Sequence, residues 1–189
     1  MFFVTEPSKG TIDGFLAKVS GSDLSYSDVG ATDRMPPAGY VLDHNRIELG
    51  NGERCWEAAK KAICEWKMFN FDWVDIHPNR TPIETGQNVA VLIRHFGFYS
   101  LNAARIVYSI DEADRFGFAY GTLEDHGESG EERFMVERDK EGKIWYDLKA
   151  FSKPNHAFAR LGYPLVRMLQ KRFANDSKQA MFRAANSIG

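Results

Sequence analysis

Hydrophobic residues in this chain recur at two spacings, which distinguish a helix from a long series of strands. Between Glu53 and Phe69 apolar residues return every three or four positions, with charged residues between them. That period is typical of an amphipathic helix with one buried face. The pattern therefore predicts a helix from Glu53 to about Phe69. It follows a strand over 41–50 and a turn at Gly50, Asn51 and Gly52.

From residue 71 onward the hydrophobic period is close to two, as expected for strands. The segments with this pattern are FDWVDIHP (71–78), NVAVLIRHF (88–96), ARIVYSIDE (104–112), FGFAYGTL (116–123), ERFMVERD (132–139) and KIWYDLKAF (143–151). Most of them are separated by only a few residues rich in Gly and Asp. Because parallel neighbours need a crossover of a dozen residues or more, these strands are expected to form an antiparallel meander.

The chain turns helical again near its C-terminus. An apolar stripe runs from Leu161 to Ala184, and Pro164 is tolerated only in a first helical turn. We expect a short segment through Leu161, a break at Gly162 and Tyr163, and a long helix that opens at Pro164. Residues 1–39 are interrupted by Gly and Pro and show no sustained period, so they are expected to form an arm on a domain of residues 40–189.

This order of elements predicts an α+β fold in which a curved antiparallel sheet grips the long C-terminal helix. It resembles the helix-grip fold of the START and Bet v 1 superfamily. The motifs LSYSDVGAT (24–32), HNRIELGNGERCWEAAKKAICEWKMF (44–69), FGFAYGTLEDHGESGEERFMVE (116–137) and WYDLKAFSKPNHAFARLGYPLVRMLQKRFANDSKQAM (145–181) are similar to those of the domain of unknown function 1990 family, also called UPF0548. The resemblance to the START and Bet v 1 superfamily implies an apolar ligand between sheet and helix. The resemblance to the DUF1990 family implies a fold and brings no set of catalytic residues.

Composition agrees with a single domain that has a large core. The chain has 189 residues, of which 43% are hydrophobic and 13% aromatic. A net charge of -2 argues against nucleic acid as a partner. The two cysteines lie nine positions apart in one predicted helix, too far for a disulfide, and the N-terminus has no signal-peptide pattern. We expect a cytoplasmic protein without an integral membrane segment; a homodimer is left open.

The loop after FGFAYGTL carries the strongest candidate chemistry. His126 with Glu131 or Glu132 would make an acid–base pair at the mouth of a pocket. Glu132 shares a strand face with Phe134, so it points inward if Phe134 does. The alternative is a solvated hairpin loop whose charges only keep the turn soluble.

Aromatic residues on the strands would wall the pocket, and two arginines would give polar selectivity. The predicted ligand-binding residues are Arg94, Arg105, Phe118, Tyr120, Glu132, Phe134, Trp145 and Tyr146. The other interpretation of these aromatic residues is plain core.

Other groups offer weaker signals. Ser152, Lys153, His156 and Arg160 lie where the last strand leaves the sheet, and helix capping by Ser152 or Asn155 is favoured over catalysis. The five histidines lie on different elements without metal-ligand spacing, so no metal and no cofactor are expected.

Three hypotheses about function follow. The first is a module that binds a small hydrophobic or amphipathic ligand between the sheet and the C-terminal helix. The second is an acid–base enzyme, such as a cyclase, isomerase or hydrolase, that uses His126 with Glu131 or Glu132. The third is an interaction or membrane-associated protein that uses the basic positions of the C-terminal region, Arg160, Arg167, Lys171, Arg172 and Lys178.

Overall fold

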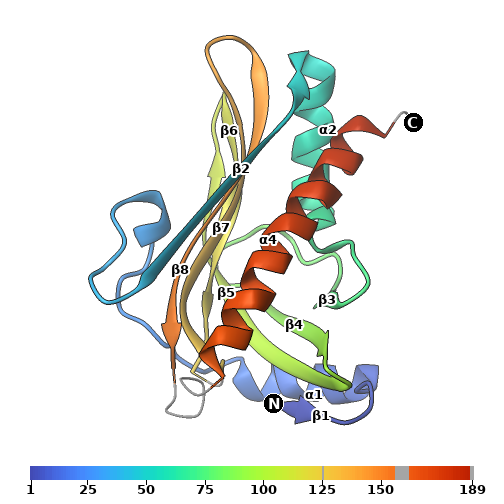
Figure 1. The fold of residues 1–189 in the computed structure, drawn as a ribbon, viewed down its shortest axis with the longest axis vertical. Helices are drawn as coiled ribbons and strands as arrows, with labels where there is room; N and C mark the ends of the chain where they lie inside the picture. Colours follow the sequence, from blue (N-terminus) through green and yellow to red (C-terminus); the bar gives the residue numbers. More distant parts are fainter. Residues whose placement is uncertain (125, 156–161, 188–189) are drawn as a thin grey trace.

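A strongly bent antiparallel sheet embraces a long C-terminal helix (Figure 1). The computed structural model describes residues 1–124, 126–155 and 162–187. Its elements are β1 (Phe2–Phe3), α1 (Lys9–Val19), η1 (Ala31–Asp33), β2 (Val41–Asn51), α2 (Gly52–Cys64), η2 (Lys67–Phe69), β3 (Val74–His77), β4 (Asn88–His95), β5 (Phe98–Asp111), β6 (Arg115–Thr122), β7 (Glu128–Arg138), β8 (Lys143–Pro154) and α4 (Tyr163–Asn186). The strand order is β2-β8-β7-β6-β5-β4-β3, and β1 pairs with β5.

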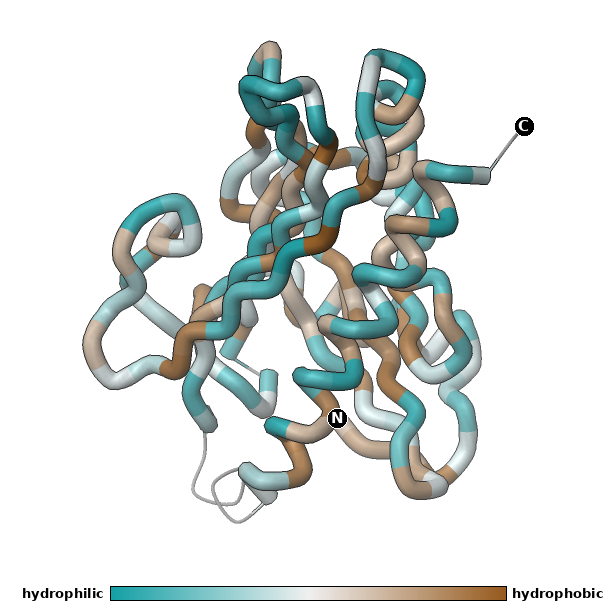
Figure 2. The backbone as a smooth tube through the Cα atoms, turned by 45° about the horizontal axis from the view of Figure 1, so that its top comes forward, coloured by the Kyte–Doolittle hydropathy of each residue, from teal (hydrophilic) through white to brown (hydrophobic). Residues whose placement is uncertain are grey.

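The predicted meander is confirmed from β4 to β8, since each of these strands pairs with the next one along the chain. The sheet is extended at one edge by β2, whose Val41 pairs with Ser152 at the far end of β8. The α+β helix-grip architecture expected from the order of elements is therefore confirmed. Hydrophobic and hydrophilic residues alternate along several of the extended strands (Figure 2), as expected where one face of an antiparallel sheet is packed and the other faces solvent.

The helix that the hydrophobic pattern predicts from Glu53 to about Phe69 corresponds to α2, which is shorter. α2 ends at Cys64, and Trp66 adopts a left-handed backbone conformation with φ 55° before the short helix η2. The Trp66 indole Nε1 donates to the carbonyl oxygen of Thr81 at 2.8 Å, which fixes the side chain in the core. The apolar period continues to Phe69 because the residues after the bend also face inward.

The C-terminal helix begins at Tyr163, and Pro164 lies in its first turn as predicted. Small buried residues, Ala174, Ser177 and Ala180, bring its central part close to the rest of the domain. The Tyr146 hydroxyl of β8 lies 2.8 Å from the Ser177 Oγ, a buried hydrogen bond between sheet and helix. The predicted short segment through Leu161 lies outside the described residues.

The N-terminal arm contains a helix that the pattern did not predict. Ile12, Phe15 and Val19 of α1 are buried against β4 and β5, on the face of the sheet opposite α4. Glycines at positions 10 and 14 lower helix propensity by about 1 kcal/mol each and obscure the apolar period. Burial of the apolar face overrides that local preference.

Candidate functional site

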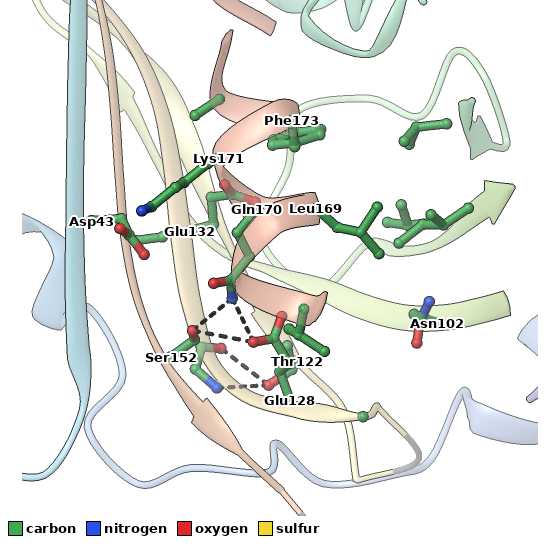
Figure 3. Close-up of a pocket in the computed structure, with 18 of the residues that line it drawn as sticks. Asp43, Asn102, Thr122, Glu128, Glu132, Ser152, Leu169, Gln170, Lys171 and Phe173 are labelled. Carbon is green, nitrogen blue, oxygen red and sulfur yellow. Dashed lines mark hydrogen bonds between the residues drawn. The ribbon is translucent and has the colours of Figure 1, made fainter. Parts of the chain in front are cut away.

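A cavity of about 1020 Å³ lies between the concave face of the sheet and α4. It is walled by β2, by the strands from β4 to β8 and by one side of α4, and Figure 3 shows its polar end. Most of the surface is apolar. The main apolar contributors are Phe69, Trp73, Val74, Val91, Ile93, Tyr120, Leu148, Leu165, Val166, Leu169 and Phe173.

An aromatic cluster closes one side of the cavity. The Phe173 ring of α4 lies 5.4 Å from Phe69 and 6.4 Å from Phe134, measured between centroids. Trp66 and Phe118 extend the cluster into the core. Because these rings are packed on one another, they form a fixed wall rather than a flexible surface.

Glu132 is the central polar group inside the cavity. Its carboxylate accepts a hydrogen bond from the Tyr120 hydroxyl at 2.8 Å. Burial raises the pKa of Glu132 to about 7; the Tyr120 hydrogen bond opposes the rise, and the charges of Glu128 and Asp43 add to it. Burial likewise raises the pKa of Tyr120 well above its ordinary value, so Tyr120 stays a donor.

A second carboxylate, Glu128, lies on the same face of β7. Its Oε1 accepts hydrogen bonds from the Gln170 amide of α4 and from the Ser152 hydroxyl of β8, as Figure 3 shows. Gln170 Nε2 also donates to Ser152 Oγ at 3.1 Å. Burial raises the pKa of Glu128, although the Gln170 and Ser152 hydrogen bonds oppose that rise.

An ion pair positions this network. Both terminal nitrogens of Arg167 donate to the carboxylate of Asp43 on β2, and Nη1 also donates to the Gln170 Oε1. The hydrogen bond from Arg167 Nη1 to Gln170 Oε1 fixes the orientation of the Gln170 amide, so that the amide nitrogen faces Glu128. Arg167 was expected on a basic surface of the C-terminal region, and the structure instead uses it to join α4 to the edge of the sheet.

His126 lines the cavity but forms no hydrogen bond with Glu132. Its Nδ1 accepts the backbone N–H of Glu128 at 3.0 Å, so the neutral ring carries its proton on Nε2. Burial lowers the pKa of His126 to about 4. The hypothesis of a His126–Glu132 acid–base pair therefore does not match the geometry, because each group is engaged by a different neighbour.

Glu131 was the alternative acid–base candidate, and its carboxylate turns to the opposite face of the sheet. There it accepts hydrogen bonds from the Tyr26 hydroxyl at 2.8 Å, the Gly30 N–H at 2.7 Å, and the Thr32 N–H and hydroxyl. The side chain of this residue anchors the N-terminal arm and has no lone pair aimed at the cavity.

The two predicted selectivity arginines also face outward. Arg94 is exposed, and Arg105 Nε donates to Asn88 while its Nη2 donates to the Ser20 carbonyl at the end of α1. Both lie on the β4–β5 face that packs on the arm, so the placement does not fit a role at the cavity.

Of the predicted aromatic lining residues, Tyr120 reaches the cavity. Phe118, Phe134 and Tyr146 are fully buried in the core. Trp145 lies on the outer face, where its Nε1 donates to Asp139 at 2.9 Å and the Arg46 guanidinium stacks 4.4 Å from its ring.

Sequence reasoning missed several polar residues of the site. Glu128 falls between the predicted strands 116–123 and 132–139, whereas β7 already begins at Glu128, so the alternation that turns Glu132 inward also turns Glu128 inward. Ser152 was expected to cap a helix, but it lies in β8 and donates to Glu128. Gln170, Ser100 and Asn102 also belong to the polar lining. His156 and Arg160 lie outside the described residues.

Within the described ranges, no three His, Cys, Asp or Glu side chains gather closely enough to hold a metal ion. None of the helices that the structure describes is long and apolar enough to cross a membrane.

Comparison with known proteins places this arrangement in a family. The model of the family described as domain of unknown function (DUF1990) matches residues 25–180. The chain belongs to this family. A UPF0548 protein of Dictyostelium discoideum is 35% identical over 209 residues, covering 99% of this chain and 97% of the relative. A UPF0548 protein of Deinococcus radiodurans is 38% identical over 198 residues, covering 98% and 99%.

Solved structures share the fold of this DUF1990 protein at low sequence identity. A hypothetical protein from Helicobacter pylori, jhp0584, is 10% identical with a TM-score of 0.58, covering 82% of this chain and 93% of its own. Human STARD10 is 10% identical with a TM-score of 0.50, covering 96% and 80%. The di-domain ARO/CYC BexL is 12% identical with a TM-score of 0.51, covering 81% and 52%. These likenesses show the helix-grip fold alone.

Proposed function

We propose that this DUF1990 protein binds a small hydrophobic or amphipathic molecule in the cavity between the sheet and α4. The observation that carries the proposal is the cavity of about 1020 Å³ with its largely apolar wall. Sites for small molecules are concave, mostly apolar and equipped with a few polar groups, and their volumes are about 300–1,000 Å³. The cavity lies at the upper end of that range.

The size of the cavity supports occupancy by a ligand. Enclosed voids in protein cores cost about 24 cal/mol per Å³, so a closed, dry void of this size would cost about 24 kcal/mol, whereas this cavity is partly open to solvent. Whole domains are stable by only about 5–15 kcal/mol. The space must therefore hold water or a ligand, and an apolar wall offers water few hydrogen-bond partners.

The proposal is tested by filling the cavity with larger side chains and measuring how tightly the protein binds a neutral fluorescent probe, N-phenyl-1-naphthylamine. Ala150 on β8 and Leu169 on α4 both line the cavity, and the double variant Ala150→Trp/Leu169→Trp places two bulky rings inside it. We expect probe affinity to fall by about ten-fold or more. The control Arg94→Trp adds the same side chain on the outer face and should bind as the wild type does. Circular dichroism identifies the folded variants, and unchanged binding by a folded double variant would refute the proposal.

An acid–base enzyme is the second candidate, and Glu132 favours it. A carboxyl group with a pKa of about 7, hydrogen-bonded to a tyrosine inside an apolar cavity, exchanges protons readily at neutral pH. In this version Glu132 keeps the acid–base role that the sequence suggested for it, and Tyr120 replaces His126 as its partner. Chemical conversion of a bound compound that Glu132→Gln abolishes without loss of binding would distinguish catalysis from simple binding.

A further inference from the structure

The charges around the cavity are unbalanced. Four acidic residues border it, but the carboxylate of Glu131 turns to the opposite face of the sheet, and Asp43 is paired with Arg167. Glu128 and Glu132 remain, and no described cation lies within ion-pair distance of either carboxylate.

The other ionisable groups of the lining do not compensate for these carboxylates. Burial lowers the pKa of both His95 and His126, which keeps their rings neutral at pH 7. His44 is directed to Asp147, at 2.7 Å. Lys171 is exposed at the edge of the cavity.

Each carboxylate retains an oxygen that can accept a further hydrogen bond. Tyr120 donates to the Oε2 of Glu132, and both donors to Glu128 bind its Oε1. Among the described residues, the Glu132 Oε1 and the Glu128 Oε2 have no donor. Neither oxygen is one of the buried side-chain atoms that lack a hydrogen-bond partner. Because no described donor reaches either oxygen, both are accessible from the cavity. The polar end of the cavity therefore offers acceptors and negative charge.

Resting on the proposed function, we infer that the ligand is an amphipathic amine: its apolar body lies among Val91, Leu169 and Phe173, and its protonated amino group donates to Glu132. Charge-assisted hydrogen bonds of this kind are roughly twice as strong as those between neutral groups. A carboxylate head group would instead face two acidic side chains in a medium of low dielectric constant. The site thus selects against fatty acids.

The inference is tested with three probes that share one alkyl chain: 1-decylamine, 1-decanol and decanoic acid. Each displaces N-phenyl-1-naphthylamine from the full-length protein at pH 7.4. We expect the amine to displace it at about ten-fold lower concentration than the alcohol, the difference that about 1.4 kcal/mol produces. Decanoate should be the weakest of the three.

Substitutions of single residues show which carboxylate causes the preference for the amine over the alcohol. Glu132→Gln keeps an acceptor for Tyr120 and should reduce the amine-to-alcohol preference to less than three-fold. Glu128→Gln should reduce the preference by less, because Gln170 and Ser152 already donate to Glu128. The control Glu137→Gln changes a residue of the same strand that pairs with Arg46 away from the cavity, and it should behave as the wild type does.

The outcomes separate this inference from the proposed function. Binding of decanol or decanoate as tightly as the amine would overturn the inference and leave the binding function intact. A preference that persists in folded Glu132→Gln would overturn the role of Glu132. If neither the dye nor any probe binds the wild type, the proposed function fails and the inference fails with it. The wild-type comparison is decisive even if a variant does not fold.

Discussion

Replacing Glu131 with glutamine isolates the role of the buried carboxylate that anchors the N-terminal arm. Glu131 is 2% exposed and accepts four hydrogen bonds, two on each oxygen. One donor on each oxygen is a backbone N–H, from Gly30 or from Thr32, and the other is a hydroxyl. Glu131→Gln keeps the shape of the side chain but converts one acceptor oxygen into a donor NH₂.

The hydroxyls of Tyr26 and Thr32 can rotate and accept from the new amide, but a backbone N–H cannot. Whichever way the amide turns, one backbone N–H faces another donor. The loss of one charge-assisted hydrogen bond costs about 1.5–3 kcal/mol, and the unpaired buried N–H adds about 1–3 kcal/mol. Removing a buried charge offsets part of this cost, so we expect the free energy of unfolding to fall by about 2–4 kcal/mol.

Urea denaturation of the wild type and the variant measures this difference, and limited chymotrypsin digestion shows whether the chain opens at Tyr26 before it unfolds globally. Glu137→Gln is the matched control: Glu137 lies on the same strand, and its partly exposed ion pair with Arg46 is expected to be worth less than about 1 kcal/mol. If Glu131→Gln destabilises no more than this control and the arm stays protected, the anchoring role assigned to Glu131 is wrong.

Two further predictions concern the interior. The pKa of Glu132 is about 7 in the folded protein against an ordinary value of 4.5, so its contribution to stability is fully present below pH 4.5 and is lost as the pH rises through 7. The difference in unfolding free energy between the wild type and Glu132→Gln should therefore fall by at most about 3 kcal/mol between pH 4.5 and pH 8, and a flat or rising difference would contradict the assignment. Ser177→Ala should lower the free energy of unfolding by about 1–3 kcal/mol, because it leaves the buried Tyr146 hydroxyl unpaired. A double-mutant cycle with Tyr146→Phe should show coupling between the two residues, whereas additive losses of stability would mean that they act independently.

Several features of this protein follow from the sequence by itself. The meander from β4 to β8 was predictable because short connections force neighbouring strands to pair locally. Glu132 was predicted to point inward, and it lines the cavity because it shares a strand face with the buried Phe134. The long helix from Tyr163 to Asn186 was marked by its apolar stripe and by the proline in its first turn.

Other features depend on contacts that no local pattern records. The network of Glu128, Gln170 and Ser152 joins three elements, and its members come together only once α4 crosses the sheet. The same holds for β2, whose partner β8 lies about a hundred residues further along the chain. Pairings at such separations depend on the complete fold, since each segment alone is compatible with several neighbours.

The clearest limit is the choice between the two faces of a strand. In β4, Val91 and Ile93 face the cavity, whereas Ala90 and Leu92 pack on α1. Alternation identifies two sets of side chains, but when both faces are covered by apolar layers it does not indicate which layer holds the ligand site. The sequence therefore determined the strands and the local pairing from β4 to β8. Only the tertiary structure decided that Arg94 faces outward, because it placed α1 on one side of the sheet and α4 with the cavity on the other.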